Sequence, residues 1–209
     1  MRLSTLMLML GMVTPAIASA SPPSPANSTT PSCVSLVGSY GGVPATGAGQ
    51  FSVVYRDIAN NPIAGATVVI DLSGAPDLHI CADQLDPAAI VDCIHKPVSK
   101  LTAADGSVSF TLLGGSNGAG NASTLLGGGK IFANGTLIQT PTVAAYDLDG
   151  SSGVGANDLS AWLTDFGSGN PYGRSDYDCS GGVGANDLSF WLTEFGAGTS
   201  ASSCAASCP

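Results

Sequence analysis

One segment of the chain occurs twice, and this duplication constrains the fold more than any other feature of the sequence. Residues 147–167 and 176–196 match in register, with Asp147 corresponding to Asp176 at an offset of 29 positions. Each copy begins with twelve residues rich in Asp, Gly and Ser, and continues with apolar residues three to four positions apart. A repeat of this quality indicates one local unit that is built twice.

The first twelve residues of each copy place oxygen-bearing groups at alternate positions. Positions 1, 3 and 12 are Asp, position 5 is Ser, and position 7 offers a backbone carbonyl. These residues are Asp147, Asp149, Ser151, Gly153 and Asp158 in the first copy, and Asp176, Asp178, Ser180, Gly182 and Asp187 in the second. An EF-hand loop supplies the six to eight oxygen ligands of Ca²⁺ from the same positions. Solvated turns are the alternative, since these residues also form turns. The duplication and the helix that follows favour calcium, so we predict two bound calcium ions.

The two loops differ at one position. The glycine expected at position 6 is present as Gly181, but the first loop has Ser152 there. We therefore expect the first loop to be strained or weaker. Position 9 is Gly155 or Gly184, which would need a water molecule as ligand. With only three carboxylates per loop, dissociation constants of about 10⁻⁶ to 10⁻³ M are expected.

A short amphipathic helix follows each loop. Its apolar residues fall at i, i+3, i+4 and i+7, the spacing of one helical face. They are Leu159, Trp162, Leu163 and Phe166 in the first copy, and Leu188, Trp191, Leu192 and Phe195 in the second. Helices this short need tertiary contacts. We predict that the two pack face to face with the Trp and Phe rings between them.

A calcium loop followed by one helix, present twice and without an entering helix, resembles the type I dockerin domain over residues 147–196. The resemblance implies two calcium ions, two antiparallel helices and docking to a cohesin module in an extracellular assembly. Cohesin-binding dockerins typically carry Ser/Thr-type residues at loop positions 10 and 11. This chain has Ala156-Asn157 and Ala185-Asn186 there, and no Lys or Arg in either helix.

The N-terminus is typical of an exported protein. Arg2, an apolar stretch from Leu6 to Val13 and the small residues 18–20 predict a signal peptide over residues 1–20, cleaved after Ala20. Residues 21–32 are rich in Pro, Ser and Thr, and they are expected to form a flexible or polyproline-like tether.

Residues 33–145 predict many short strands, the pattern of a β-sandwich. The expected strands cover residues 51–57, 66–72, 107–113, 130–133, 136–139 and 142–146. Asn134-Gly135 is a strong hairpin signal. The glycine-rich residues 114–129 do not fit a phosphate-binding motif and are expected to be a flexible loop.

Residues 56–70 and 101–110 are similar to the bacterial Ig-like repeats of invasin and intimin, with an Asn-Pro turn before one strand and an Asp-Gly turn before another. The resemblance implies an Ig-like sandwich that serves as spacer, adhesin stalk or binding module. The expected fold is mainly β with a small α part: a sandwich over residues 33–145, a dockerin-like domain over 146–197 and a tail over 198–209.

Six cysteines in an exported chain favour disulfides. Cys81 with Cys93 is the shortest plausible bridge, Cys179 could join Cys204 or Cys208, and Cys33 would take the remaining partner. The spacing leaves these pairings open. The absence of a C-x-x-C pair disfavours zinc.

Charge and composition exclude several functions. A net charge of −9 disfavours nucleic acid and anionic membranes as partners. His79 and His95 lie in no catalytic motif, and the only Glu is Glu194, so a paired-Glu glycosidase site is excluded, whereas a pair of Asp residues stays open. We expect a secreted, non-catalytic protein with a calcium-dependent structural or protein-interaction role. The alternative is a carbohydrate-binding or adhesin module that binds a polysaccharide through Tyr40, Tyr55 or Tyr172.

Overall fold

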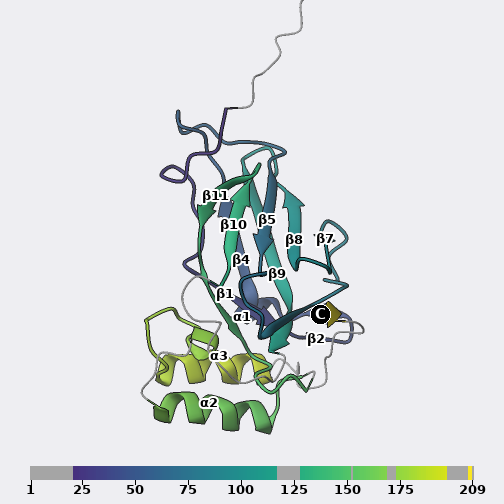
Figure 1. Cartoon of the computed structure of the whole chain (residues 1–209), viewed down its shortest axis with the longest axis vertical. Helices are drawn as coiled ribbons and strands as arrows, with labels where there is room; N and C mark the ends of the chain where they lie inside the picture. Colours follow the sequence, from purple (N-terminus) through teal and green to yellow (C-terminus); the bar gives the residue numbers. More distant parts are fainter. Residues whose placement is uncertain (1–20, 117–127, 152, 169–172, 197–206, 209) are drawn as a thin grey trace, which may run out of the picture.

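A computed structural model describes residues 21–116, 128–151, 153–168, 173–196 and 207–208. Two larger β-sheets form most of this part of the chain, and two helices lie across one end of the sheets (Figure 1). The expectation of a mainly β fold with a small helical part is therefore confirmed.

The six-stranded sheet is arranged around one long strand. Its members are β1 (Cys33–Val37), β4 (Gln50–Val54), β6 (Leu78–Cys81), β9 (Ser107–Ser116), β12 (Thr142–Ala145) and β13 (Ser207–Cys208). The first half of β9 pairs with β4, and its second half pairs with β1 and β6. Strand β1 runs parallel to β12, which leads directly into the first loop.

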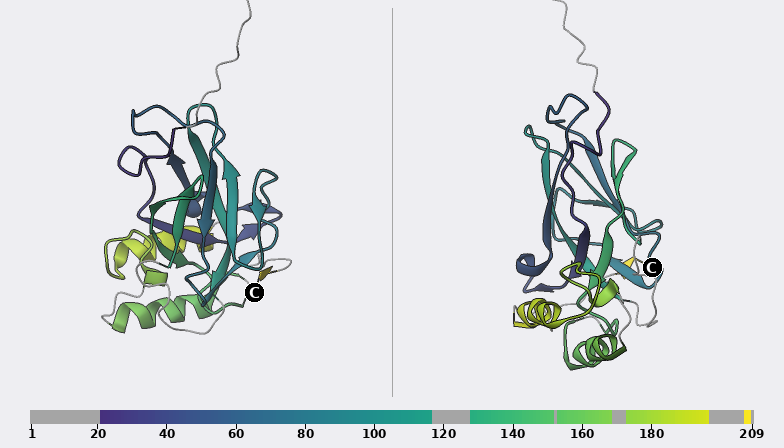
Figure 2. Two further views of the ribbon diagram at one scale, coloured as in Figure 1. Left: turned by 45° about the horizontal axis from the view of Figure 1, so that its top comes forward. Right: turned by 90° about the vertical axis from the view of Figure 1, so that its left-hand side faces the viewer.

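The five-stranded sheet has the order β11 (Thr136–Gln139), β10 (Lys130–Ala133), β5 (Thr67–Asp71), β8 (Pro97–Leu101) and β7 (Ile90–Val91). The predicted hairpin joins β10 and β11, with positive φ at both Asn134 and Gly135. Buried residues of both sheets, such as Ile70 and Leu112, form one core. The side view shows the two sheets as facing layers (Figure 2).

Three small elements complete the sheet end of the molecule. Strands β2 (Ser39–Tyr40) and β3 (Val43–Pro44) form a hairpin through Gly41 and Gly42. A four-residue helix, α1 (Thr46–Gly49), leads into β4.

A second core joins the helices to the sheets. Helices α2 (Ala156–Ser168) and α3 (Ala185–Gly196) bury Trp162 and Trp191. These rings share their cluster with Val37, Leu113 and Ala144 of the six-stranded sheet, and with Tyr146, Leu148 and Tyr177 beside it. The buried side chains of the two helices therefore share one core with residues at the end of the six-stranded sheet.

The predicted burial of the Phe rings between the helices is wrong. Phe166 and Phe195 are 53% and 44% exposed, and each stacks on the Trp of its own helix at 5.4 and 5.3 Å. Leu163 and Leu192 are also exposed. The buried stripe contains acidic residues instead, namely Asp158, Trp162 and Asp165 in α2 and Asp187, Trp191 and Glu194 in α3. These carboxylates accept hydrogen bonds from groups of the loops and the sheet, so the acidic side chains can lie on the inner face of each helix.

Residues 21–32 do not form a free tether. The backbone N–H of Ser24 donates to the carbonyl of Arg56 at 2.9 Å, and Thr29 exchanges two hydrogen bonds with Val54 at 2.8 and 2.9 Å. The Asn27 side chain donates to the carbonyl of Asp57 at 2.8 Å. Backbone groups of residues 54–57 accept and donate here, which holds the segment against the sheet. Of the glycine-rich segment, residues 114–116 belong to β9, and residues 117–127 lie outside the described part.

The disulfides join different cysteines from those considered above. Cys33 is bonded to Cys179, and Cys93 is bonded to Cys208. Because Cys93 is bonded to Cys208, a Cys81–Cys93 bridge is ruled out, and the Cys33–Cys179 bond rules out a bond between Cys179 and the tail. Cys81 is also disulfide-bonded. The prediction assumed that cysteines close in sequence pair with each other. Instead, β13 pairs with β6 and brings Cys208 back to the sheet.

Two observations bear on location. Disulfides are typical of oxidising environments such as the cell exterior, which fits the predicted export. Among the described residues, no helix has both the length and the apolar composition needed to cross a membrane. The predicted signal peptide, residues 1–20, lies outside the described residues.

The exposed and buried rings of α2 should differ in their effect on stability. Trp162→Ala should lower the free energy of unfolding by about 3–5 kcal/mol, because it removes a buried ring from the second core. Phe166→Ser should lower it by about 1 kcal/mol or less, because that ring is half exposed. Chemical denaturation measures both, and equal losses would contradict the described packing.

Candidate metal centre

Two clusters of three aspartates lie at the end of the sheets where the helices begin. One contains Asp147, Asp149 and Asp158, and the other contains Asp176, Asp178 and Asp187. In each cluster, one carboxylate oxygen from every residue lies within 4.8 Å of the others. The first two aspartates of each cluster come from the loop, and the third is in the first turn of α2 or α3. Each cluster could hold a metal ion.

The third aspartate of each cluster accepts hydrogen bonds that connect the loop to the helix that follows it. Asp158 Oδ1 accepts the backbone N–H groups of Leu148 at 2.6 Å and Asp149 at 2.9 Å, and its Oδ2 accepts that of Gly155 at 2.6 Å. In the second loop, Asp187 accepts the equivalent groups of Tyr177, Asp178 and Gly184 at 2.7, 3.1 and 2.7 Å. Both carboxylates are only 1% exposed. The sequence repeat is therefore also a repeat of hydrogen bonds.

The other carboxylates also accept loop N–H groups. Asp147 accepts from Gly150 at 2.9 Å and Gly153 at 3.3 Å. Asp176 accepts from Ser180 at 3.0 Å and Gly181 at 2.9 Å. Each ionised carboxylate has about four lone-pair sites, so acceptor capacity remains for a cation after these bonds are made.

The electrostatics of the clusters favour a cation. Burial, together with the nearby charge of Asp149, raises the pKa of Asp158 above its usual value. Burial and the charge of Asp187 raise the pKa of Asp176 in the same way. A divalent ion between the carboxylates would offset this repulsion and favour their ionised forms.

Positions 5 and 7 of the second loop contact each other. In the second loop, Ser180 Oγ donates to the backbone carbonyl of Gly182 at 3.2 Å, so these two predicted ligands are bonded to each other. An ion bound by both would have to replace that hydrogen bond. Ser151 is exposed and Gly153 is buried in the first loop, while Ser152 lies outside the described residues.

Strand β9 supports the first loop in a way the sequence did not reveal. The backbone N–H of Ser116 donates to the carbonyl of Asp147 at 2.7 Å. A Cβ added at Gly115 would lie 2.9 Å from both Cβ and Oδ2 of Asp147. The missing side chain at Gly115 therefore leaves room for a predicted ligand. Its only sequence signal was a glycine run that also fits a loop.

The second loop is attached to the same sheet, at the edge strand β12 and its neighbour β1. Tyr177 stacks on Tyr146 with ring centroids 4.3 Å apart, and its hydroxyl donates to the carbonyl of Ala145 in β12 at 3.1 Å. Cys179, in the same loop, is bonded to Cys33 at the start of β1. The sheet therefore holds both loops.

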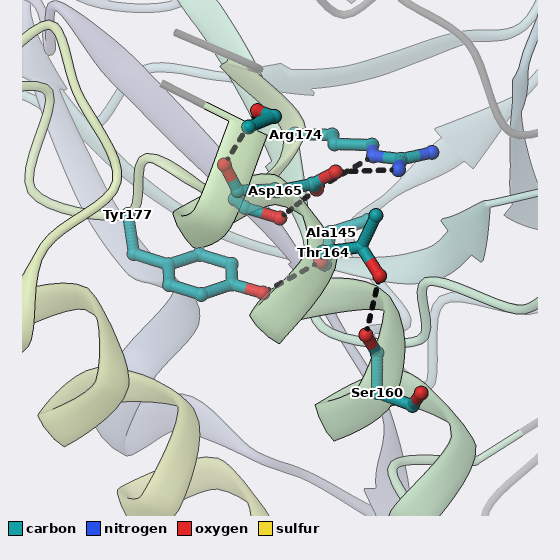
Figure 3. A network of polar contacts seen from close by, with 8 residues as sticks. Ala145, Ser160, Thr164, Asp165, Arg174 and Tyr177 are labelled. Atoms are coloured by element: carbon teal, nitrogen blue, oxygen red, sulfur yellow. Dashed lines mark hydrogen bonds and ion pairs between the residues drawn. The ribbon is translucent and has the colours of Figure 1, made fainter. Parts of the chain in front are cut away.

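A buried ion pair connects the two copies. Arg174 donates from Nε and Nη2 to the two carboxylate oxygens of Asp165 at 2.9 and 2.7 Å (Figure 3). Ser175 Oγ donates to Asp165 at 2.6 Å. Because Ser175 directly precedes Asp176, the end of α2 holds the start of the second loop. At the equivalent position of α3, Glu194 accepts the backbone N–H of Gly38 at 3.3 Å and so contacts the sheet.

No protein family, curated protein or solved structure matches this chain. The function therefore has to be inferred from the chemistry of the two acidic clusters and from the way the sheets hold them.

The ion pair between Asp165 and Arg174 should be important for stability. Asp165→Asn should lower the free energy of unfolding by about 3–5 kcal/mol, because it removes the buried carboxylate charge that pairs with the Arg174 guanidinium. The partly exposed pair of Asp86 and Lys100, 2.7 Å apart, is the control, and Asp86→Asn should change stability by about 1 kcal/mol or less. Similar losses in denaturant titrations would show that the Asp165 pair has no special role.

Gly115 should matter for the first cluster alone. Gly115→Ala places a methyl group against Asp147 and should weaken calcium binding at the first loop by roughly 10- to 100-fold, as is typical when residues behind a metal ligand are changed. Gly167→Ala is the matched control, because a Cβ there meets nothing within 4 Å. Calcium titration of both variants tests this, and an unchanged first site in Gly115→Ala would refute it.

Proposed function

We propose that this chain is a secreted, non-catalytic calcium-binding protein. Two ions would order the loop–helix copies and fix them to the sheets, in a structural or protein-interaction role. The observation that carries this proposal is the pair of equivalent clusters, each with three converging aspartates. Like charges held this close in partly buried positions favour a bound cation.

Calcium fits the donor set better than other metals. Both clusters consist of aspartates, whose oxygen atoms suit hard cations, whereas zinc and copper sites typically include His or Cys. Mg²⁺ usually keeps several of its waters and binds through only one or two carboxylates. The proposed ligands are Asp147, Asp149, Ser151, Gly153 and Asp158, and Asp176, Asp178, Ser180, Gly182 and Asp187.

The order of elements supports a dockerin-like reading of residues 146–197. A loop followed by a helix occurs twice, and a 3₁₀ turn, Gly173–Ser175, is what precedes the second loop. The facing sheets with a common core similarly support an Ig-like reading of residues 33–145. Both likenesses are proposals that rest on local pattern and element order.

An interaction role is supported by the apolar surface of the two helices. Phe166 and Leu163 of α2, and Phe195 and Leu192 of α3, are all 44–53% exposed. Exposed apolar surface on a soluble protein often marks contact with another protein when it forms a continuous patch. A cohesin-like module is the partner that the dockerin likeness suggests.

Carbohydrate or adhesin binding is the second candidate, and one observation favours it. Tyr40 is 62% exposed in β2, where its ring could stack on a sugar. Tyr55 is fully buried and cannot do so, and Tyr172 lies outside the described residues. Polysaccharide pull-down that is lost in Tyr40→Ala would favour this candidate over protein interaction.

Calorimetric titration of the mature protein should reveal two calcium sites. Asp147→Ala should abolish the first and Asp176→Ala the second, whereas Asp83→Asn, at an exposed aspartate outside the clusters, should leave both unchanged. Each site should stabilise the fold by about 2.7 kcal/mol when free calcium is 100 times its dissociation constant. An identical melting temperature in chelator and in millimolar calcium, with no heat of binding, would refute the proposal.

A further inference from the structure

The second loop alternates between residues directed to the acidic cluster and residues attached to the sheet. Asp176 and Asp178, at positions 1 and 3, belong to the cluster. Tyr177, at position 2, stacks on Tyr146 and donates to Ala145 of β12. Cys179, at position 4, is bonded to Cys33 of β1. Both neighbours of Asp178 are therefore fixed to the six-stranded sheet.

The first loop lacks one of these two attachments. Its position 2 is Leu148, which is buried in the second core, but its position 4 is Gly150, which has no side chain. The chain nonetheless has the same backbone conformation at both places, with φ of 70° at Gly150 and 57° at Cys179. Glycine adopts this left-handed conformation readily, whereas a residue with a Cβ rarely does. In the second loop, the residue in this conformation is the cross-linked one.

This attachment matters because of where Asp178 lies. It is less buried than Asp176 and Asp187, the other members of its cluster. Its carboxylate accepts the backbone N–H of Ser180 at 2.9 Å and the side-chain amide of Asn186 at 3.3 Å. If Asp178 became ordered only when the ion bound, the lost conformational entropy of this residue would weaken calcium binding. Because Tyr177 and Cys179 are already fixed to the sheet, part of this entropy is lost during folding and does not weaken binding.

We propose that Cys33 and Cys179 are positioning residues for the second ion site. Their bond holds the backbone on either side of Asp178 in the ion-binding arrangement, so the second loop depends on it and the first does not. This inference rests on the proposed calcium function. It makes the second site sensitive to reduction: a dithiol gives two electrons and two protons to the bond, which becomes two thiols, and the dithiol becomes a cyclic disulfide.

The reverse effect follows from thermodynamic linkage. If the bond raises calcium affinity at the second site, bound calcium must make the bond harder to reduce by the same factor. Both cysteines of this bond are half-buried, as is Cys93, whereas Cys208 is fully buried. A soluble dithiol can therefore approach either sulfur of the Cys33–Cys179 bond, but only the Cys93 sulfur of the Cys93–Cys208 bond.

Variants with a single remaining site test the proposal in the full mature chain. Asp147→Ala leaves only the second site, and Asp176→Ala leaves only the first. Cys33→Ser with Cys179→Gly is added to each, because glycine is the residue that the first loop has at position 4. In the Asp147→Ala protein, the calcium dissociation constant should rise about tenfold, equivalent to about 1.4 kcal/mol. In the Asp176→Ala protein it should change by less than about twofold, as for distant independent sites.

A second pair of cysteine substitutions separates positioning from general loss of a cross-link. Cys93→Ser with Cys208→Ser removes a different bond and should change the dissociation constant of either site by less than about twofold. An equal change at both sites with the Cys33 and Cys179 substitutions, or no change at either, would overturn the positioning role.

Reduction of the folded protein with its native cysteines provides a measurement that does not depend on whether the cysteine variants fold. At equilibrium with a fixed ratio of oxidised to reduced dithiothreitol, calcium should lower the reduced fraction of the Cys33–Cys179 bond, as measured by alkylation and peptide mapping, and it should not do so in Asp176→Ala. Equal reduced fractions with and without calcium would overturn the inference. If the unsubstituted protein takes up no calcium in calorimetry, the proposed function fails as well. If it takes up two ions and the bond has no effect, only the positioning role fails.

Discussion

Each of the two helices begins with a buried aspartate whose carboxylate accepts three backbone N–H groups of the preceding loop. Asp158 and Asp187 make these bonds at equivalent positions, and the rest of each loop is arranged around them. A carboxylate buried to this extent is stable only when hydrogen bonds or opposite charge replace its hydration. The helix starts, the loop shapes and the convergence of the other aspartates all follow from this requirement.

The same requirement explains why the helical part is joined so closely to the sheets. Asp147 follows β12 without a linker and lies against Gly115 of β9. Tyr177 and Cys179 attach the second loop to β12 and β1. The buried Trp rings complete a core that includes sheet residues. An ion bound in either loop would therefore stabilise the end of the sheets as well as the helices, which is the physical basis for a calcium-dependent extracellular structure.

Some features could be predicted because they depend on neighbours in sequence. The converging aspartates follow from loop spacing, the β10–β11 hairpin follows from Asn134-Gly135, and alternation in β9 predicts burial of Val108, Phe110 and Leu112. The inner faces of the helices could not be predicted in this way. Apolar periodicity favoured Phe166 and Phe195, but Asp165 and Glu194 are buried instead. Their partners, Arg174, Ser175 and Gly38, are brought close only by the folded chain.

Residue types and short-range spacing were enough to predict the mainly β class, the duplication and the oxygen-rich character of the two loops. The cysteine pairing, the position of residues 21–32 and the burial of particular helical residues became known only from the folded chain. These features depend on contacts between segments far apart in the chain. Cys33 and Cys179, for example, lie close together because the second loop is bonded to β12 through Tyr177, and β12 pairs with β1.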